Sequence, residues 1–133
     1  MIFIDTSAVV AILMDESDAR TLSAKLEAAT HALTSSAVRL EACMVLASRR
    51  DISPLRAQHY FDGLASEMGL TEIPIDERIG RLAVECFERY GKGRHPAQLN
   101  FGDCLSYASA KAVGAPLLFK GEDFVKTDVN APA

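Results

Sequence analysis

The sequence predicts an α/β fold in which helices cover both faces of a parallel sheet. Short apolar runs alternate with longer helical patterns along the whole chain, and the first run, residues 2–4, is apolar at every position. No repeat, low-complexity tract or linker divides the sequence. A length of 133 residues with 49% hydrophobic residues therefore fits one domain, residues 1–133, with a core of its own.

The first half of the chain begins with a strand and a short helix. Ile2–Ile4 is expected to be a strand buried on both faces, which is typical of the middle of a parallel sheet. Thr6 or Ser7 can then cap a helix over Ala8–Leu13. The next patterns predict a helix over residues 16–29, a brief strand running into a cap over 31–36, and helices over 37–50 and 53–69.

Capping residues define several of these boundaries. Ser35 or Ser36 can cap the helix over 37–50, and Ser53 with Pro54 is a typical start for the helix over 53–69. Arg49 and Arg50 fall in the last turn of the helix over 37–50, where cations interact favourably with the helix dipole.

The second half supplies two more strands and two more helices. Residues 70–75 predict a strand, after which Asp76 can cap a helix over 77–91. A helix over 101–114, closed by Gly114, precedes a strand over 116–119. The pattern thus contains four strand candidates, and a fifth short strand near the C-terminus is left open.

Composition narrows the function classes. A formal charge of −4 argues against coating nucleic acid by bulk attraction, although the segment Arg78–Gln98 holds five cations and two acids, a local charge of +3. Cys43, Cys86 and Cys104 are widely spaced and form no CxxC pair, so we expect reduced core residues. The chain starts without a basic leader, and its longest apolar stretch, Ala8–Met14, is too short to span a bilayer. We therefore expect a cytoplasmic protein with no membrane contact.

Four acids occupy positions where acids are unusual. Asp5 follows the first strand, and Asp123 lies in the loop after the last one, so both fall at the carboxyl edge of a parallel sheet. Glu41 shares a helix stripe with Val38, and Asp103 lies near the start of the helix over 101–114. Each acid also has a structural explanation of its own. This is a turn for Asp5, a pairing with Arg39 or solvation for Glu41, a position near a cap for Asp103 and a surface loop for Asp123.

If the four acids converge, they need a counter-charge. Two ionised carboxylates about 4 Å apart repel by roughly 4 kcal/mol at an effective dielectric constant near 20, so such a cluster takes up protons or holds a cation. Oxygen ligands favour Mg²⁺ or Mn²⁺. The three histidines have no spacing suited to zinc: His31, His59 and His95.

These segments resemble the PIN-domain ribonucleases, specifically the VapC toxins of bacterial toxin–antitoxin pairs. "FIDTSA" is similar to the first-strand signature and places Asp5, and "RLEA" places Glu41. "NFGDCLSYASAK" is the most specific match and places Asp103. "PLLFKGEDFVKTDV" resembles the tail motif, with Asp123 as the fourth acid and Glu122 as a possible neighbour.

The resemblance implies a fold, an activity and partners. The implied fold is a PIN-like α/β/α sandwich around a parallel sheet of four or five strands. The implied activity is an endoribonuclease that uses Mg²⁺ or Mn²⁺ to cleave RNA phosphodiester bonds, with Asp5, Glu41, Asp103 and Asp123 as catalytic and metal-binding residues. A cognate antitoxin and a homodimer are the implied protein partners.

Other function classes fit less well. In a phospho-accepting receiver module, Asp76 would accept the phosphate and Lys120 would sense it, but such a site wants two adjacent acids where the chain has Asp5 followed by Thr6. A phosphatase with a first-strand nucleophile would need an acid in place of Ser7, and a dinucleotide-binding domain would need a glycine-rich turn there. A catalytically silent PIN-like RNA-binding module remains a second hypothesis.

Two surfaces are expected to contact partners. Arg89, Lys92 and Arg94 precede the third acid, and we expect them to guide RNA into the acid cluster, because carboxylates alone repel phosphates. The first helix is apolar on most positions, so Val9 and Ile12–Leu13 are expected to line a groove that another chain covers.

Overall fold

A parallel sheet of four strands forms the centre of the computed structural model, which describes residues 1–132. The strand order is β3-β2-β1-β4, and each neighbouring pair is parallel. No fifth strand follows β4 in the described part of the chain. The predicted α/β fold is confirmed with four strands, whose bounds are β1 (Ile2–Ile4), β2 (Ala32–Thr34), β3 (Thr71–Glu72) and β4 (Leu117–Leu118).

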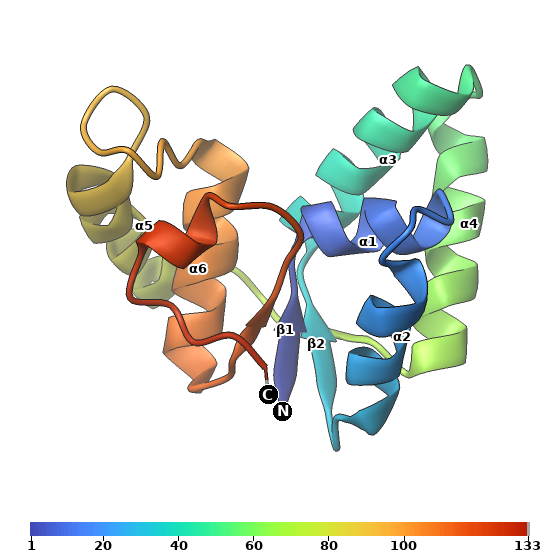
Figure 1. Ribbon diagram of the computed structural model, residues 1–133, viewed down its shortest axis with the longest axis horizontal. Helices are drawn as coiled ribbons and strands as arrows, with labels where there is room; N and C mark the ends of the chain where they lie inside the picture. The colour runs from blue at the N-terminus through green and yellow to red at the C-terminus, as the bar shows by residue number, and fades with distance from the viewer. Residues whose placement is uncertain (133) are drawn as a thin grey trace.

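Helices cover the sheet on both faces (Figure 1). Figure 1 shows α5 and α6 on one side of the strands and the first four helices on the other. This division follows from right-handed crossovers, because the chain moves outward from β1 to β3 and then returns past β1 to β4. The bounds are α1 (Thr6–Leu13), α2 (Ala19–Ala28), α3 (Ser36–Arg50), α4 (Pro54–Met68), α5 (Glu77–Tyr90), α6 (Phe101–Val113) and the 3-10 helix η1 (Phe124–Lys126).

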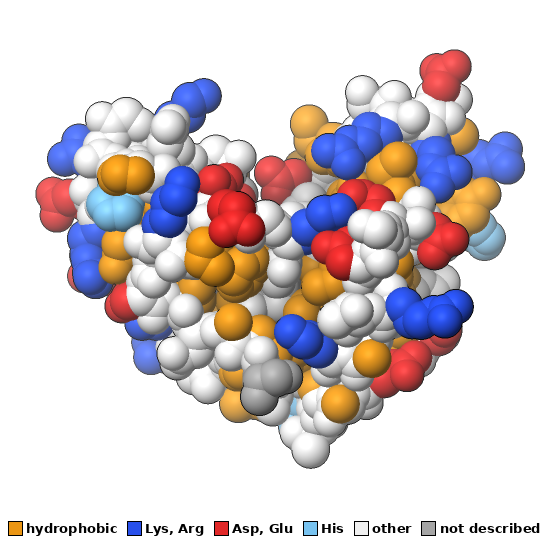
Figure 2. Space-filling model, viewed as in Figure 1, with side chains coloured by type: hydrophobic (Ala, Val, Ile, Leu, Met, Phe, Trp, Pro, Cys, Tyr) orange, Lys and Arg blue, Asp and Glu red, His pale blue; other side chains and the backbone are white. Residues whose placement is uncertain are grey.

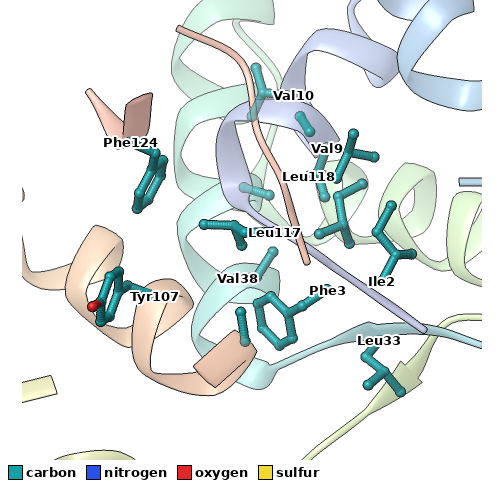
Figure 3. Close-up of a cluster of buried hydrophobic side chains, with 14 of the residues drawn as sticks. Ile2, Phe3, Val9, Val10, Leu33, Val38, Tyr107, Leu117, Leu118 and Phe124 are labelled. Carbon is teal, nitrogen blue, oxygen red and sulfur yellow. The ribbon is translucent and has the colours of Figure 1, made fainter. Parts of the chain in front are cut away.

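The central strand is buried along its whole length. Phe3 pairs with Leu33 on one side and with Leu117 on the other, and it is 0% exposed. Figure 3 shows these strand side chains in one cluster with Val9 of α1 and Tyr107 of α6. A strand covered on both faces by helices carries apolar residues at every position, which explains the unbroken run at residues 2–4.

The predicted helix boundaries are largely confirmed by their caps. Ser35 accepts a hydrogen bond from the Val38 amide, and Ser53 accepts one from the Arg56 amide. Gly114 ends α6 with φ +66°, a left-handed conformation that favours glycine. The strands β3 and β4 are shorter than the ranges predicted for them, 70–75 and 116–119.

The start of α1 differs from the prediction. Neither Thr6 nor Ser7 is the cap, because the helix already begins at Thr6 and Asp5 is the N-cap residue. Asp5 has an extended backbone, and its side chain accepts the Ser7 amide at 3.0 Å. The first acid is therefore itself the residue that turns the chain from β1 into α1.

The groove predicted on α1 is only partly present. Val9 is 0% exposed within the single chain, so its assignment to an open groove is wrong. Ile12 and Leu13 are half-buried, and Leu13 lines a hollow of about 250 Å³ together with Ile52 and Tyr60. The core takes up Val9 because it lies next to β1, while the end of the helix extends beyond the sheet.

Two further features concern the cysteines and the helices. The cysteines are free and buried, as expected of reduced core residues: Cys43, Cys86 and Cys104. Among residues 1–132, no helix has the length and apolar character needed to cross a membrane.

Replacing Asp76 with Ala tests the cap of α5. The Asp76 side chain accepts the Ile79 amide at 3.0 Å, so its loss should lower the free energy of unfolding by about 1 kcal/mol. Urea unfolding measures this change. A protein with the parent's stability would show that the cap adds nothing.

Candidate active site

Three of the four predicted acids line one hollow at the carboxyl edge of the sheet. Asp5 follows β1, Glu41 lies on α3 and Asp103 lies on α6, and the three surround a space of about 290 Å³, which we call the acid hollow. Figure 2 shows Asp and Glu side chains around the notch between the α5–α6 side and the α1–α3 side of the molecule. Parallel strands end at the same edge, which is why segments far apart in the sequence meet there.

The carboxylate of Asp5 is fixed through one oxygen and unpartnered at the other. Its Oδ2 accepts the Ser7 amide at 3.0 Å and the Ser7 hydroxyl at 2.6 Å. Its Oδ1 is buried and accepts no hydrogen bond, and the residue is 2% exposed. A buried carboxylate oxygen without a donor is costly, and this oxygen is therefore the first candidate to bind a cation.

Glu41 lies directly over the first turn of α6. A Cβ atom placed on Gly102 would lie 2.6 Å from both Glu41 carboxylate oxygens, so the absence of a side chain at Gly102 leaves the space that Glu41 occupies. Glu41 is half-buried and does not pair with Arg39, which instead binds Asp62 at 2.6 Å and Glu72 at 2.9 Å. The structural explanation of Glu41 as a partner of Arg39 is therefore wrong.

Asp103 is oriented by a capping box at the start of α6. Its Oδ2 accepts the Asn100 amide at 3.0 Å, and its own amide donates to Asn100 Oδ1 at 2.9 Å. The capping box occupies Oδ2 and fixes the side chain at the rim of the acid hollow. Asp5 and Asp103 thus share one device, in which a helix N-terminus orients a carboxylate.

The acids influence one another electrostatically. Burial, together with the negative charges of Asp5, Glu41 and Asp123, raises the pKa of Asp103 to about 6, against the lowering effect of the hydrogen bond from the Asn100 amide. Asp103 therefore holds its proton more tightly than an ordinary aspartate. Asp103 thus behaves as expected of a partly buried carboxylate beside other acids.

Asp123 stands apart from the other three acids. It precedes η1, it is exposed, and it does not line the acid hollow, although its charge acts on Asp103. Glu122 beside it is also exposed. The structure therefore brings together three of the predicted acids and places the fourth at the periphery.

The acids of the hollow do not converge closely enough to form a metal site without some movement of their side chains. Within residues 1–132, no set of three or more His, Cys, Asp or Glu side chains is arranged to hold a metal ion as it stands. A second buried oxygen at the hollow, Thr6 Oγ1, also has no hydrogen-bond partner. Two consecutive residues, Asp5 and Thr6, thus each have a buried side-chain oxygen without a hydrogen-bond partner. This is unusual for a turn with a purely structural role.

The sequence analysis did not place the cations and the extra acid of this hollow beside the predicted acids, and it named Lys120 only as the sensing lysine of the receiver hypothesis. Lys120, Arg49 and Glu16 line it together with the three acids. Lys120 follows β4 at the same sheet edge as Asp5, so its place after a strand could have identified it. Arg49 was assigned to the dipole of its helix, and nothing in the local sequence indicates that Glu16 folds back to it.

The basic segment predicted to guide RNA lies on α5 and the loop after it. Arg89 donates to the Tyr90 hydroxyl at 2.9 Å and lies 3.9 Å from Asp128, while Arg94 donates to the Glu88 carbonyl oxygen at 3.1 Å. Lys92 is exposed. None of the three cations lines the acid hollow.

The residues of the receiver hypothesis are not brought together at one site. Asp76 is an exposed cap of α5 and does not line the acid hollow, whereas Lys120 does. A phosphoacceptor and its sensing lysine must share one pocket, so this geometry argues against a receiver.

Comparison with known proteins identifies relatives over almost the full length. The family model for the PIN domain matches residues 2–130. Ribonuclease VapC28 of Mycobacterium tuberculosis is 45% identical over 128 residues, 96% of this chain and 94% of the relative. Ribonuclease VapC42 of the same organism is 38% identical over 128 residues, 96% of this chain and 95% of the relative.

A solved structure has the same fold. The crystal structure of Mycobacterium tuberculosis VapC20, described as a toxin that cleaves the sarcin–ricin loop, superposes with a TM-score of 0.76. The match covers 97% of this chain and 96% of the other at 19% identity, which is evidence for the fold alone.

The raised pKa of Asp103 predicts that the metal-free protein loses stability as the pH rises. Because the folded-state pKa is about 6, against an ordinary value near 4, the folded protein binds this proton more tightly than the unfolded chain. The resulting stability is complete below about pH 4 and is lost as the pH passes 6. With its partial exposure taken into account, we expect a loss of about 1–2 kcal/mol, measured as a falling Tm between pH 4.5 and 7 in chelator. Asp103→Asn should flatten this profile, and identical slopes for both proteins would contradict the prediction.

Gly102→Ala tests the packing of Glu41 on α6. The new methyl group should displace the Glu41 carboxylate and lower the free energy of unfolding relative to the matched variant Gly80→Ala, whose Cβ meets no atom within 4 Å. An exposed helical Gly→Ala change on its own raises stability by about 0.5–1 kcal/mol, so the control should gain and Gly102→Ala should not. Thermal unfolding of both variants measures the difference, and equal gains would show that Glu41 does not need this space.

Proposed function

The chain belongs to the PIN domain family and, within it, to the VapC-type ribonuclease toxins, and on this premise we propose that the acid hollow cleaves RNA phosphodiester bonds with the help of a divalent cation. The observation on which this depends is the meeting of Asp5, Glu41 and Asp103, from three separate elements, around one hollow. The activity is that of an endoribonuclease, the toxin of a toxin–antitoxin pair.

The residues of the hollow fit Mg²⁺ or Mn²⁺. The unpartnered, buried Oδ1 of Asp5 is an anionic oxygen without a donor, and every acid at the hollow offers oxygen ligands of the kind these ions prefer. Asp5, Glu41 and Asp103 would hold the ion, with Asp123 completing the set from the periphery. A bound ion would offset both the burial and the neighbouring negative charges that raise the pKa of Asp103.

The protein contributes orientation and charge to the reaction. When bound, a divalent cation supplies an activated water and stabilises negative charge on the phosphate and the leaving oxygen. The caps at Asp5 and Asp103 hold these carboxylates in place before substrate arrives, so no ordering is needed at the moment of reaction. Glu41 remains in place because Gly102 leaves room for it.

The path of the RNA toward the hollow is a further part of this proposal. Arg89, Lys92 and Arg94 lie on α5 and the loop after it, and they give the α5–α6 side a positive charge that would attract the backbone. RNA in the cytoplasm is the substrate we propose, and three free, buried cysteines are consistent with that reducing compartment.

Two protein partners also belong to this proposal. A homodimer is supported by the large apolar side chains Val84, Phe87 and Phe101, which are 71%, 43% and 82% exposed and line one hollow on α5 and α6. A second copy of the chain would cover them. We propose an antitoxin as the second partner, and the hollow beside Leu13 is an apolar surface on which it could bind.

Charge-neutralising variants of the acids test the proposed activity. Asp5→Asn, Glu41→Gln and Asp103→Asn should each reduce the cleavage of total cellular RNA in Mn²⁺ by at least about 100-fold, because each removes a ligand or its charge. Mn²⁺ should raise the Tm of the parent by stabilising the folded state, by about 2.7 kcal/mol at 100 times the Kd, and the variants should lose this rise.

Asp51→Asn serves as the matched control. Asp51 ends α3 in a left-handed conformation that Asn also tolerates, and it is exposed and outside the acid hollow. This variant should keep both the cleavage and the Mn²⁺ response. Cleavage that survives in Asp103→Asn would contradict the role proposed for Asp103, whereas a parent that binds Mn²⁺ without cutting RNA would favour the silent RNA-binding hypothesis.

A further inference from the structure

Two cations at the rim of the acid hollow share one carboxylate. Lys120 follows β4, Arg49 lies in the last turn of α3, and Glu16 lies between α1 and α2. The Lys120 ammonium contacts Glu16 Oε2 and lies 3.3 Å from Asp18 Oδ1, while Arg49 Nη1 lies 3.9 Å from Glu16 Oε1. Each oxygen of Glu16 therefore faces a different cation, and all three residues line the same hollow as Asp5.

Fold stability does not account for this arrangement. The side chains of Lys120 and Arg49 are 34% and 56% exposed, and ion pairs between groups this accessible add little to stability. Figure 2 shows Lys and Arg side chains directly beside Asp and Glu side chains on the α1 side of the notch. The cations thus stand at the open surface of the hollow, where a ligand can reach them.

The position of Lys120 is tied to that of Asp5. The Lys120 amide donates to the Ser7 hydroxyl oxygen at 3.0 Å, and the same hydroxyl donates to Asp5 Oδ2 at 2.6 Å. This two-step connection fixes where the lysine leaves the backbone relative to the first acid. A phosphate bound by Lys120 would therefore have a defined place beside the acids.

A phosphodiester matches the group that now lies between the cations. The Glu16 carboxylate presents two anionic oxygens to two donors, and the two non-bridging oxygens of a backbone phosphate can do the same. Arginine offers a planar set of donors to such oxygens, and lysine offers a compact point charge. Acids repel RNA, so cations at the same rim are needed where the backbone passes them.

A side-chain rotation of Glu16 removes the one carboxylate that faces both cations, while Asp18 stays beside Lys120 alone. Its amide donates to the Ala11 carbonyl oxygen at 3.0 Å, and its own carbonyl oxygen accepts the Ala19 amide at 2.9 Å. These bonds hold the backbone between α1 and α2. The carboxylate can thus leave the cations without any change in the helices.

We propose that Lys120 and Arg49 together bind an RNA backbone phosphate next to the scissile bond, and that this phosphate replaces the Glu16 carboxylate between them. The inference rests on the proposed ribonuclease function and adds a substrate site to it. Glu16 acts as an internal anion that neutralises the cations in the free protein. RNA binding exchanges one anion for another at this place.

Steady-state kinetics of charge-neutralising variants test the exchange. The substrate is the RNA that the parent cuts most efficiently in Mn²⁺, fitted with a fluorophore and a quencher and assayed over a KCl series. Lys120→Gln and Arg49→Gln should raise KM roughly tenfold with little change in kcat. The slope of log KM against log salt should fall by about 0.7 in each, the value for one lost phosphate contact on a single strand. Glu16→Gln should lower KM, because the anion that faces both cations no longer competes with the phosphate, although Asp18 still pairs with Lys120.

Matched controls separate these effects from net charge and folding. Lys126→Gln and Glu27→Gln change the same charges at exposed positions outside the hollow and should keep the parent's KM. The Mn²⁺-induced rise in Tm should persist in Lys120→Gln and Arg49→Gln, which shows that the acids are intact.

The possible failures are distinguishable. A parent that cuts no RNA overturns the proposed function and the phosphate site with it. A parent that cuts RNA while Lys120→Gln and Arg49→Gln keep its KM and salt slope overturns the phosphate site alone. A higher KM in Glu16→Gln overturns the exchange, since it would show that Glu16 helps to hold the substrate.

Discussion

The hydrogen bonds of Ser7 are the contact on which the architecture of the site depends. The Ser7 amide and hydroxyl both donate to Asp5 Oδ2, and the hydroxyl also accepts the Lys120 amide. This one residue therefore donates the amide that Asp5 caps, orients the first acid and connects the end of β1 to the end of β4. Because β1 is central and fully buried, the whole carboxyl edge of the sheet is built around a rigid point.

The same edge concentrates charge that the fold does not neutralise. Burial and three neighbouring acids raise the pKa of Asp103 to about 6, and Asp5 keeps a buried oxygen without a donor. Such groups cost stability in the free protein, and natural folds retain them mainly where a ligand compensates. The cations of the hollow differ from the acids in this respect, because Glu16 pairs with both Arg49 and Lys120 and neutralises part of their charge. The acid hollow thus combines three acids that would attract a cation with two cations that are paired with Glu16.

Local patterns predicted the fold because each one has a local cause. The apolar run Ile2–Ile4 reflects burial on both faces, and the caps at Ser35 and Ser53 satisfy amides within their own helices. The predicted start of α1 was wrong for a local reason as well. An aspartate after a strand can be the helix cap and a candidate functional acid at the same time, as Asp5 is. Val9 was misassigned because the apolar residues of α1 do not reveal which of them faces the sheet.

The sequence by itself determined the α/β class and the order of the elements, because strand ends and helix starts are marked by local chemistry. It also named four candidate acids, three of which line the acid hollow. Only the tertiary structure decided that Gly102 leaves room for Glu41, that Asp123 stays at the periphery, and that Glu16 bridges Arg49 and Lys120. These relations join segments that are distant along the chain. Their geometry depends on helix packing across the sheet, where a shift of a few ångströms makes or breaks an ion pair, and no local pattern encodes such a shift.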